Sequence, residues 1–104
     1  MKTITVEELK SKIDHNEDFQ LIDVREEFEY ETSNINGEHI PLAEVVLEKD
    51  KVARDKPVVV HCRSGKRSAQ AIMVLEAEGF DNLYNLEGGI LAWRDAFDPG
   101  MEVY

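Results

Sequence analysis

A strand, a short loop and a helix start surround the only cysteine of this chain, in the stretch VVVHCRSGKRS at residues 58–68. An apolar, β-branched run leads into Cys62, and three cations and a glycine follow within five residues. Ser68 then opens residues 69–79, which have the pattern of a helix. This geometry gathers backbone N–H groups around an anion. The stretch therefore predicts an anion-binding loop, residues 62–67, which we call the cysteine loop.

Apolar runs alternate with helical patterns along the rest of the chain. Strands are expected at residues 3–5, 20–24, 58–61 and 83–86. A brief extended piece at 39–42 contains Pro41, which confines it to a sheet edge or a strand end. Helices are expected at residues 6–13, 26–31, 42–47, 69–79 and 90–97.

Strands that alternate with helices predict an α/β fold with a mostly parallel sheet. The 104 residues leave room for a single domain, residues 1–104, with its core at about 14–98. Within it, Val6, Leu9 and Ile13 recur at helical spacing and are assigned to the core, as is Trp93. Ligands bind beyond the carboxyl ends of the strands in such sheets, which is where Cys62 stands.

The net charge of the chain is −10, although residues 62–67 carry +3. An acidic chain is a poor partner for nucleic acid or an anionic membrane, and its surface is consistent with a monomer. A cationic loop within it is explained most simply by the binding of a small anion. No apolar run reaches the roughly 18 residues of a membrane span, and the first residues lack the apolar core of a signal peptide, so a cytoplasmic protein is expected.

The cysteine loop has the chemistry of a thiolate site. A free cysteine has a pKa of about 8.5, which nearby cations and a helix N-terminus lower. Arg63, Lys66 and Arg67 supply the cations, and Gly65 permits the torsions that turn N–H groups inward. A buried, inert thiol would have no use for these charges. We therefore expect Cys62 to be a nucleophile at neutral pH, able to hold a further sulfur as the persulfide anion Cys–S–S⁻.

Other polar residues near this sheet edge are open to more than one interpretation. Asp23 and Arg25 end a strand beside Cys62, where Asp23 either holds the loop, orients one of its cations, or forms an ion pair that maintains the fold. His61 is expected to point to the opposite face from Cys62, which argues against a Cys–His dyad. One cysteine excludes an internal disulfide, and three scattered histidines do not form a metal site, so neither a metal nor a cofactor is expected.

The sequence CRSGKR at residues 62–67 resembles the active-site loop of the rhodanese (thiosulfate sulfurtransferase) family. LIDVR at 21–25 is similar to the family's strand-end Asp-Val-Arg motif, residues 34–42 to its Ile-Pro segment, and residues 85–93 to its C-terminal signature. The resemblance covers nearly the whole chain in the right order. It implies a rhodanese-like open sheet of five strands with helices on both faces, and Cys62 as the residue that carries persulfide sulfur.

The expected function is sulfur transfer by double displacement. Cys62 takes the outer sulfur of thiosulfate or of a persulfide donor, and then passes it to cyanide, a thiol or a partner protein, because no second cysteine resolves the persulfide. Arg63 and Lys66 attract the anionic donor, and Arg67 braces the loop.

The residues expected to form the site fall into two groups. The loop residues that hold donor and persulfide are Arg63, Ser64, Gly65, Lys66 and Arg67. The residues expected to support the loop are Asp23, Arg25 and Ser68.

Two alternatives remain open. Phosphatases related to this family place five residues between cysteine and arginine, whereas four separate Cys62 from Arg67, and the shorter loop suits a sulfur atom better than a phosphoryl group. A phosphatase or arsenate reductase is therefore the less favoured enzyme. A non-catalytic sulfur-relay or anion-sensing module would use the same loop and differ from the enzyme only in its acceptor.

Overall fold

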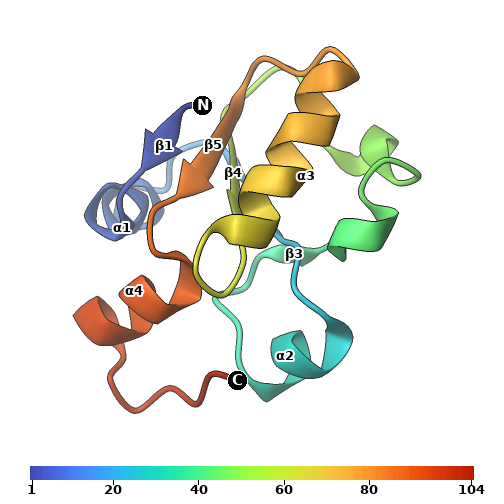
Figure 1. Cartoon of the computed structure of the whole chain (residues 1–104). Coiled ribbons are helices and arrows are strands. Elements are labelled where there is room, and N and C mark those ends of the chain that lie inside the picture. Colours follow the sequence, from blue (N-terminus) through green and yellow to red (C-terminus); the bar gives the residue numbers. More distant parts are fainter.

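The computed structural model describes residues 1–104 and contains one five-stranded sheet between helices (Figure 1). Its strands, in the spatial order β1-β5-β4-β2-β3, pair in parallel throughout. The strand bounds are β1 Thr3–Ile4, β2 Gln20–Asp23, β3 Glu38–His39, β4 Val58–His61 and β5 Leu83–Leu86. The helices are α1 Val6–Asp14, α2 Glu27–Thr32, α3 Lys66–Ala77 and α4 Gly89–Phe97. The predicted α/β class is confirmed, and β3 is at the sheet edge, as the proline next to it indicated.

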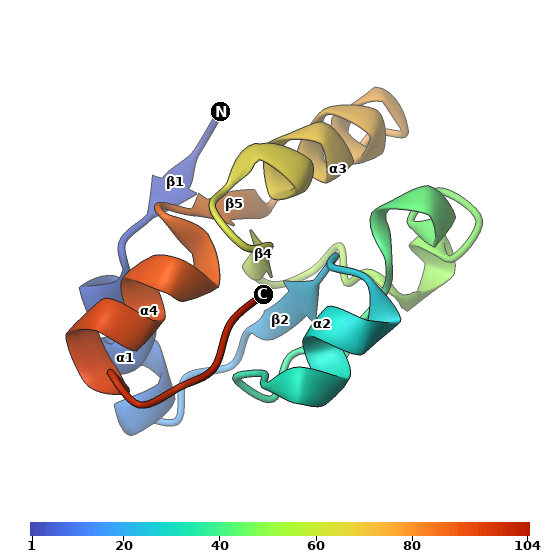
Figure 2. The ribbon, with the colours of Figure 1, turned by 60° about the horizontal axis from the view of Figure 1, so that its bottom comes forward.

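The strand before the cysteine, β4, is the middle strand and is buried along its whole length. It pairs with β2 on one side and β5 on the other, with Val59 opposite both Leu21 and Tyr84. Alternate side chains enter two separate cores, because successive residues of a strand point to opposite faces. Val58 and Val60 pack under α3, and Val59 packs with residues of α1 and α4. The sheet therefore has helices on both faces, as Figure 2 shows.

Helix α3 begins at Lys66, three residues earlier than the pattern predicted. Gly65 precedes it with φ of 110°, a left-handed conformation that glycine adopts without steric cost. This single torsion turns the chain from the loop directly into the helix, so Lys66 and Arg67 form the first helical turn. The first N–H groups of the helix have no partner within it, and the N–H of Gly65, directly before the helix, donates to the sulfur of Cys62.

Two other expectations about the elements are wrong. Ile13 was assigned to the core but is 42% exposed, and only Val6 and Leu9 of the apolar positions of α1 are buried. Residues 42–47 form a short 3-10 helix, Leu42–Glu44, which continues as turns rather than as an α-helix. Trp93 is half-buried against the α1 and α4 core, in agreement with its assignment. No helix is both long and apolar enough to cross a membrane.

Candidate active site

Cys62 lies just beyond the carboxyl end of β4, at the N-terminus of α3, and is 1% exposed. The backbone N–H of Gly65 donates to its Sγ at 3.1 Å, and the hydroxyl of Ser68 lies 3.4 Å from the same sulfur. Both contacts come from residues that follow the cysteine in the chain. The loop therefore folds back over its own thiol.

The far side of the cysteine loop is held by α4. The N–H groups of Ile90 and Leu91 donate to the carbonyl oxygens of Cys62 and Arg63, at 2.9 and 3.2 Å. The helix approaches so closely that a Cβ on Gly89 would lie 2.5 Å from the Arg63 oxygen. Because the N–H and C=O of a trans peptide point in opposite directions, carbonyls drawn toward α4 leave the amides facing the sulfur.

Asn85, in the middle of β5, links the two ends of the loop. Its Oδ1 accepts a hydrogen bond from the Ser68 hydroxyl at 2.6 Å, and its Nδ2 donates to the Gly65 carbonyl at 3.1 Å. This pair of contacts fixes the orientation of the amide. Asn85 was not among the site residues predicted from the sequence; a lone amide inside a strand of the central sheet was the signal for it.

The site lowers the pKa of the Cys62 thiol below its ordinary value. Burial alone would raise this pKa, but hydrogen bonds from the Ser68 hydroxyl and from the amides of Ser68, Gly65 and Ser64 outweigh it. The single hydroxyl proton of Ser68 is shared between the sulfur and the nearer Asn85 oxygen, so we give more weight to the amides. The lowered pKa of Cys62 thus comes mainly from hydrogen bonds within the loop, and Arg67 is the one loop cation with an electrostatic coupling to the sulfur.

We expect the thiolate to form at a lower pH in the folded chain than in the chain unfolded in urea, where its pKa is about 8.5. Thiolate absorbance in the ultraviolet measures this, because the chain has one cysteine. The unfolded chain then binds more protons between the two pKa values, so stability rises with pH in that window. This contribution is complete above the unfolded pKa and is lost as pH falls through the folded one. Equal midpoints for the two states would contradict the assignment.

The three cations of the loop differ in their contacts. Arg67 forms two hydrogen bonds with Glu29 of α2, Nη1–Oε1 at 2.6 Å and Nη2–Oε2 at 2.9 Å. Arg63 donates from Nε to the main-chain oxygen of Tyr104 at 2.6 Å. Lys66 is exposed and has no ion-pair partner. Arg67 therefore ties the loop to α2, and it does so through Glu29, a residue that no sequence motif had singled out.

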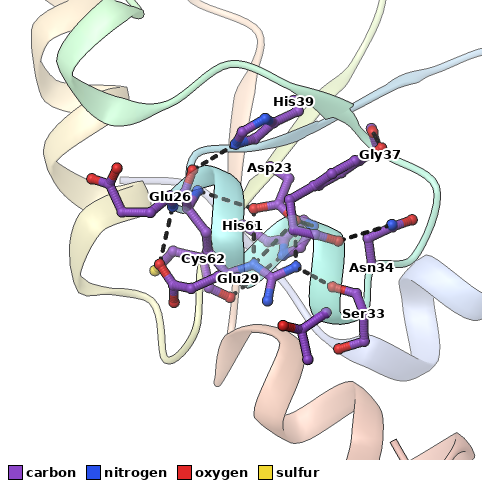
Figure 3. A network of polar contacts seen from close by, with 12 residues as sticks. Asp23, Glu26, Glu29, Ser33, Asn34, Gly37, His39, His61 and Cys62 are labelled. Carbon is purple, nitrogen blue, oxygen red and sulfur yellow. Dashed lines mark hydrogen bonds and ion pairs between the residues drawn. The ribbon is translucent and has the colours of Figure 1, made fainter. Parts of the chain in front are cut away.

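Asp23 and Arg25, the residues expected to support the loop, form an ion pair with each other. Figure 3 shows the polar network in which Asp23 lies, together with His61 and Glu29. Both side chains are fully buried, and Arg25 reaches the carboxylate with Nε and Nη2 because it lies only two residues further along the strand end. Arg25 Nη2 also donates to the Ser33 carbonyl at 2.8 Å, at the end of α2. This is the ion pair that maintains the fold, and it anchors the helix that carries Glu29.

His61 lies in the same buried network and does not form a dyad with the thiol. Its Nε2 is 3.5 Å from Asp23 Oδ2, and its Nδ1 is 3.4 Å from the carbonyl oxygen of Cys62. Burial lowers the pKa of His61, so the ring is neutral at pH 7. The histidine therefore contacts the backbone of Cys62 without being able to take the proton from its sulfur.

Comparison with known proteins agrees with this geometry. The family described as Rhodanese-like domain matches residues 5–96. The putative sulfurtransferase YtwF of Bacillus subtilis is 36% identical over 100 residues, which are 95% of this chain and 96% of that protein. The probable adenylyltransferase/sulfurtransferase MoeZ of Mycobacterium tuberculosis is 32% identical over 105 residues, and the chain spans only 27% of its length.

A solved structure shows the same fold. The Rhodanese-like Domain Protein from Staphylococcus aureus superposes with a TM-score of 0.84 at 33% identity, and the match covers 100% of this chain and 99% of that one. Sequence motifs, sheet order and the loop around Cys62 thus lead to the same assignment. The chain belongs to the rhodanese-like family, a family of sulfur transfer.

Proposed function

We propose that this chain is a sulfurtransferase that moves a sulfane sulfur from thiosulfate or a persulfide donor to a thiophilic acceptor through a persulfide on Cys62. The observation that carries the proposal is the Gly65 N–H, 3.1 Å from the Cys62 sulfur at the N-terminus of α3. A loop that favours a thiolate also favours the terminal sulfur of Cys–S–S⁻, since both are sulfur anions that accept N–H hydrogen bonds.

The reaction has two displacements. The Cys62 thiolate attacks the outer sulfur of the donor, a new S–S bond forms, and sulfite or a thiolate leaves with the electron pair of the broken S–S bond. An acceptor thiolate or cyanide then attacks the outer sulfur of the Cys62 persulfide and restores the thiolate. Lys66 and Arg63 offset the charge that develops on the leaving group.

The position of Arg67 supports sulfur transfer over phosphoryl transfer. A phosphatase would need this guanidinium to bind the equatorial oxygens of the phosphoryl group, but both of its Nη atoms are hydrogen-bonded to Glu29.

The test is the intact mass of the chain after treatment with a sulfur donor. We expect a gain of one sulfur atom with thiosulfate or a low-molecular-weight persulfide, and a return to the starting mass after cyanide is added. An unchanged mass with every donor, together with hydrolysis of p-nitrophenyl phosphate, would overturn the proposal. A stable persulfide that no small acceptor removes would indicate a relay that needs its partner protein.

A further inference from the structure

Glu29 is a buried carboxylate at the active site for which the proposed reaction has no use. Helix α2 carries it to the cysteine loop, where it is 5% exposed and its two oxygens contact Arg67. Hydrogen bonds from Arg67 lower the pKa of Glu29, so it is ionised at neutral pH. The carboxylate therefore offsets one of the three positive charges that the sequence places in the loop.

This charge changes what the loop offers to a donor. The charge of Arg67 is neutralised by Glu29, and Arg63 donates a hydrogen bond from its Nε to the main-chain oxygen of Tyr104. Lys66 alone has neither an ion-pair partner nor a hydrogen bond from its ammonium group. The reactive sulfur is itself an anion, so a donor must bring its own charge close to a like charge.

We propose that Glu29 is a specificity-determining residue and that this chain takes sulfur from organic persulfides in preference to thiosulfate. The inference rests on the sulfurtransferase function proposed above. Thiosulfate is a dianion, and an organic persulfide near neutral pH carries one charge or none on its sulfurs. Because Coulomb energy scales with the product of the charges, loss of one cation from the loop penalises the dianion twice as much as a monoanion.

The proposed step balances without an oxidant or a reductant. The Cys62 thiolate attacks the outer sulfur of R–S–SH, the bond from Cys62 to that sulfur forms, and the S–S bond of the donor breaks. R–S⁻ leaves with the electron pair of that bond. The proton remains on the transferred sulfur and is then released to solvent, which leaves Cys62–S–S⁻.

The first measurement uses the unmodified chain. Intact-mass kinetics give the second-order rate constants for sulfur uptake from thiosulfate and from cysteine persulfide. We expect cysteine persulfide to react at least about tenfold faster. We expect the thiosulfate rate constant to depend on ionic strength between about 0.05 and 0.5 M, and the cysteine persulfide rate constant to change less.

Three variants separate charge from shape. Glu29→Gln removes the charge and keeps an oxygen for Arg67 and for the Glu26 N–H; Glu29→Asp keeps the charge and shortens the side chain. Glu78→Gln is the matched control, since it breaks an exposed ion pair with Lys49 at the far end of α3, about 18 Å along the helix. We expect E29Q to raise the thiosulfate rate constant about tenfold and the persulfide rate constant at most about threefold, with E78Q within about twofold of the unmodified chain. E29D keeps the charge, and we expect it to raise the thiosulfate rate constant less than E29Q does.

The outcomes are distinguishable from a failure of the proposed function. The inference is overturned if the unmodified chain reacts faster with thiosulfate than with cysteine persulfide. This test does not depend on whether any variant folds. If E29Q and E29D change the rate constants for both donors by the same factor, Glu29 only holds the helix in place, and the inference is overturned. No mass gain with either donor refutes sulfur transfer itself.

Discussion

Replacing Cys62 with serine is expected to abolish sulfur uptake. The hydroxyl of serine is about the same size as the thiol, so the loop and α3 keep their fold. It cannot form the S–S bond on which both displacements depend, and it is not ionised at neutral pH. We expect no mass gain from any donor, and turnover lower by at least about a thousandfold.

This result is informative because the chain has no other cysteine. A mass gain on Cys62→Ser would have to come from sulfur held non-covalently or on another side chain, and would refute the role of Cys62. Thermal unfolding of the variant provides the control for folding. A transition within a few degrees of the unmodified chain shows that the loss is chemical rather than structural.

Replacing Arg25 with methionine is expected to destabilise the fold by about 3–5 kcal/mol. Methionine fills a similar volume but leaves the Asp23 carboxylate buried without its partner. The substitution also removes the hydrogen bond to the Ser33 carbonyl that ties down the end of α2. Urea unfolding at pH 7 measures the loss as a shift of the midpoint.

Lys10→Met is the matched control for this change. It breaks an exposed ion pair with Asp14, one turn apart on α1, and is expected to cost less than about 1 kcal/mol. Combining Arg25→Met with Asp23→Leu removes both charges, and we expect it to recover much of the lost stability. Equal losses for Arg25→Met and Lys10→Met would show that burial of the ion pair does not matter.

The fold was predictable because its signals are local. Apolar β-branched runs such as VVV before His61 mark buried parallel strands, and turn residues separate them from helical patterns. The position of Cys62 after such a run was enough to place it at the carboxyl edge of the sheet. The three-residue error at the start of α3 arose from one glycine torsion, which no hydrophobic pattern reports.

The partners of the loop were less predictable, since they come from elements far away in sequence. Glu29 lies on α2 and Asn85 on β5, and only the completed sheet brings them to the cysteine loop. Charge counting assigned three cations to the loop, and Arg67 was expected to brace it, but a count along the sequence does not show which residue each cation contacts. The lowered pKa of Cys62 was expected from loop N–H groups and cations together, whereas the hydrogen bond from the Ser68 hydroxyl to the sulfur was not.

The contact between α4 and the cysteine loop has a consequence for biosynthesis. Chains emerge from the ribosome N-terminus first, so Cys62 is made before the helix that orients its amides. A nascent chain that ends before Gly89 contains the nucleophile but lacks the two N–H groups that hold the Cys62 and Arg63 carbonyls. The complete set of hydrogen bonds that positions the cysteine loop therefore forms only after α4 has been synthesised.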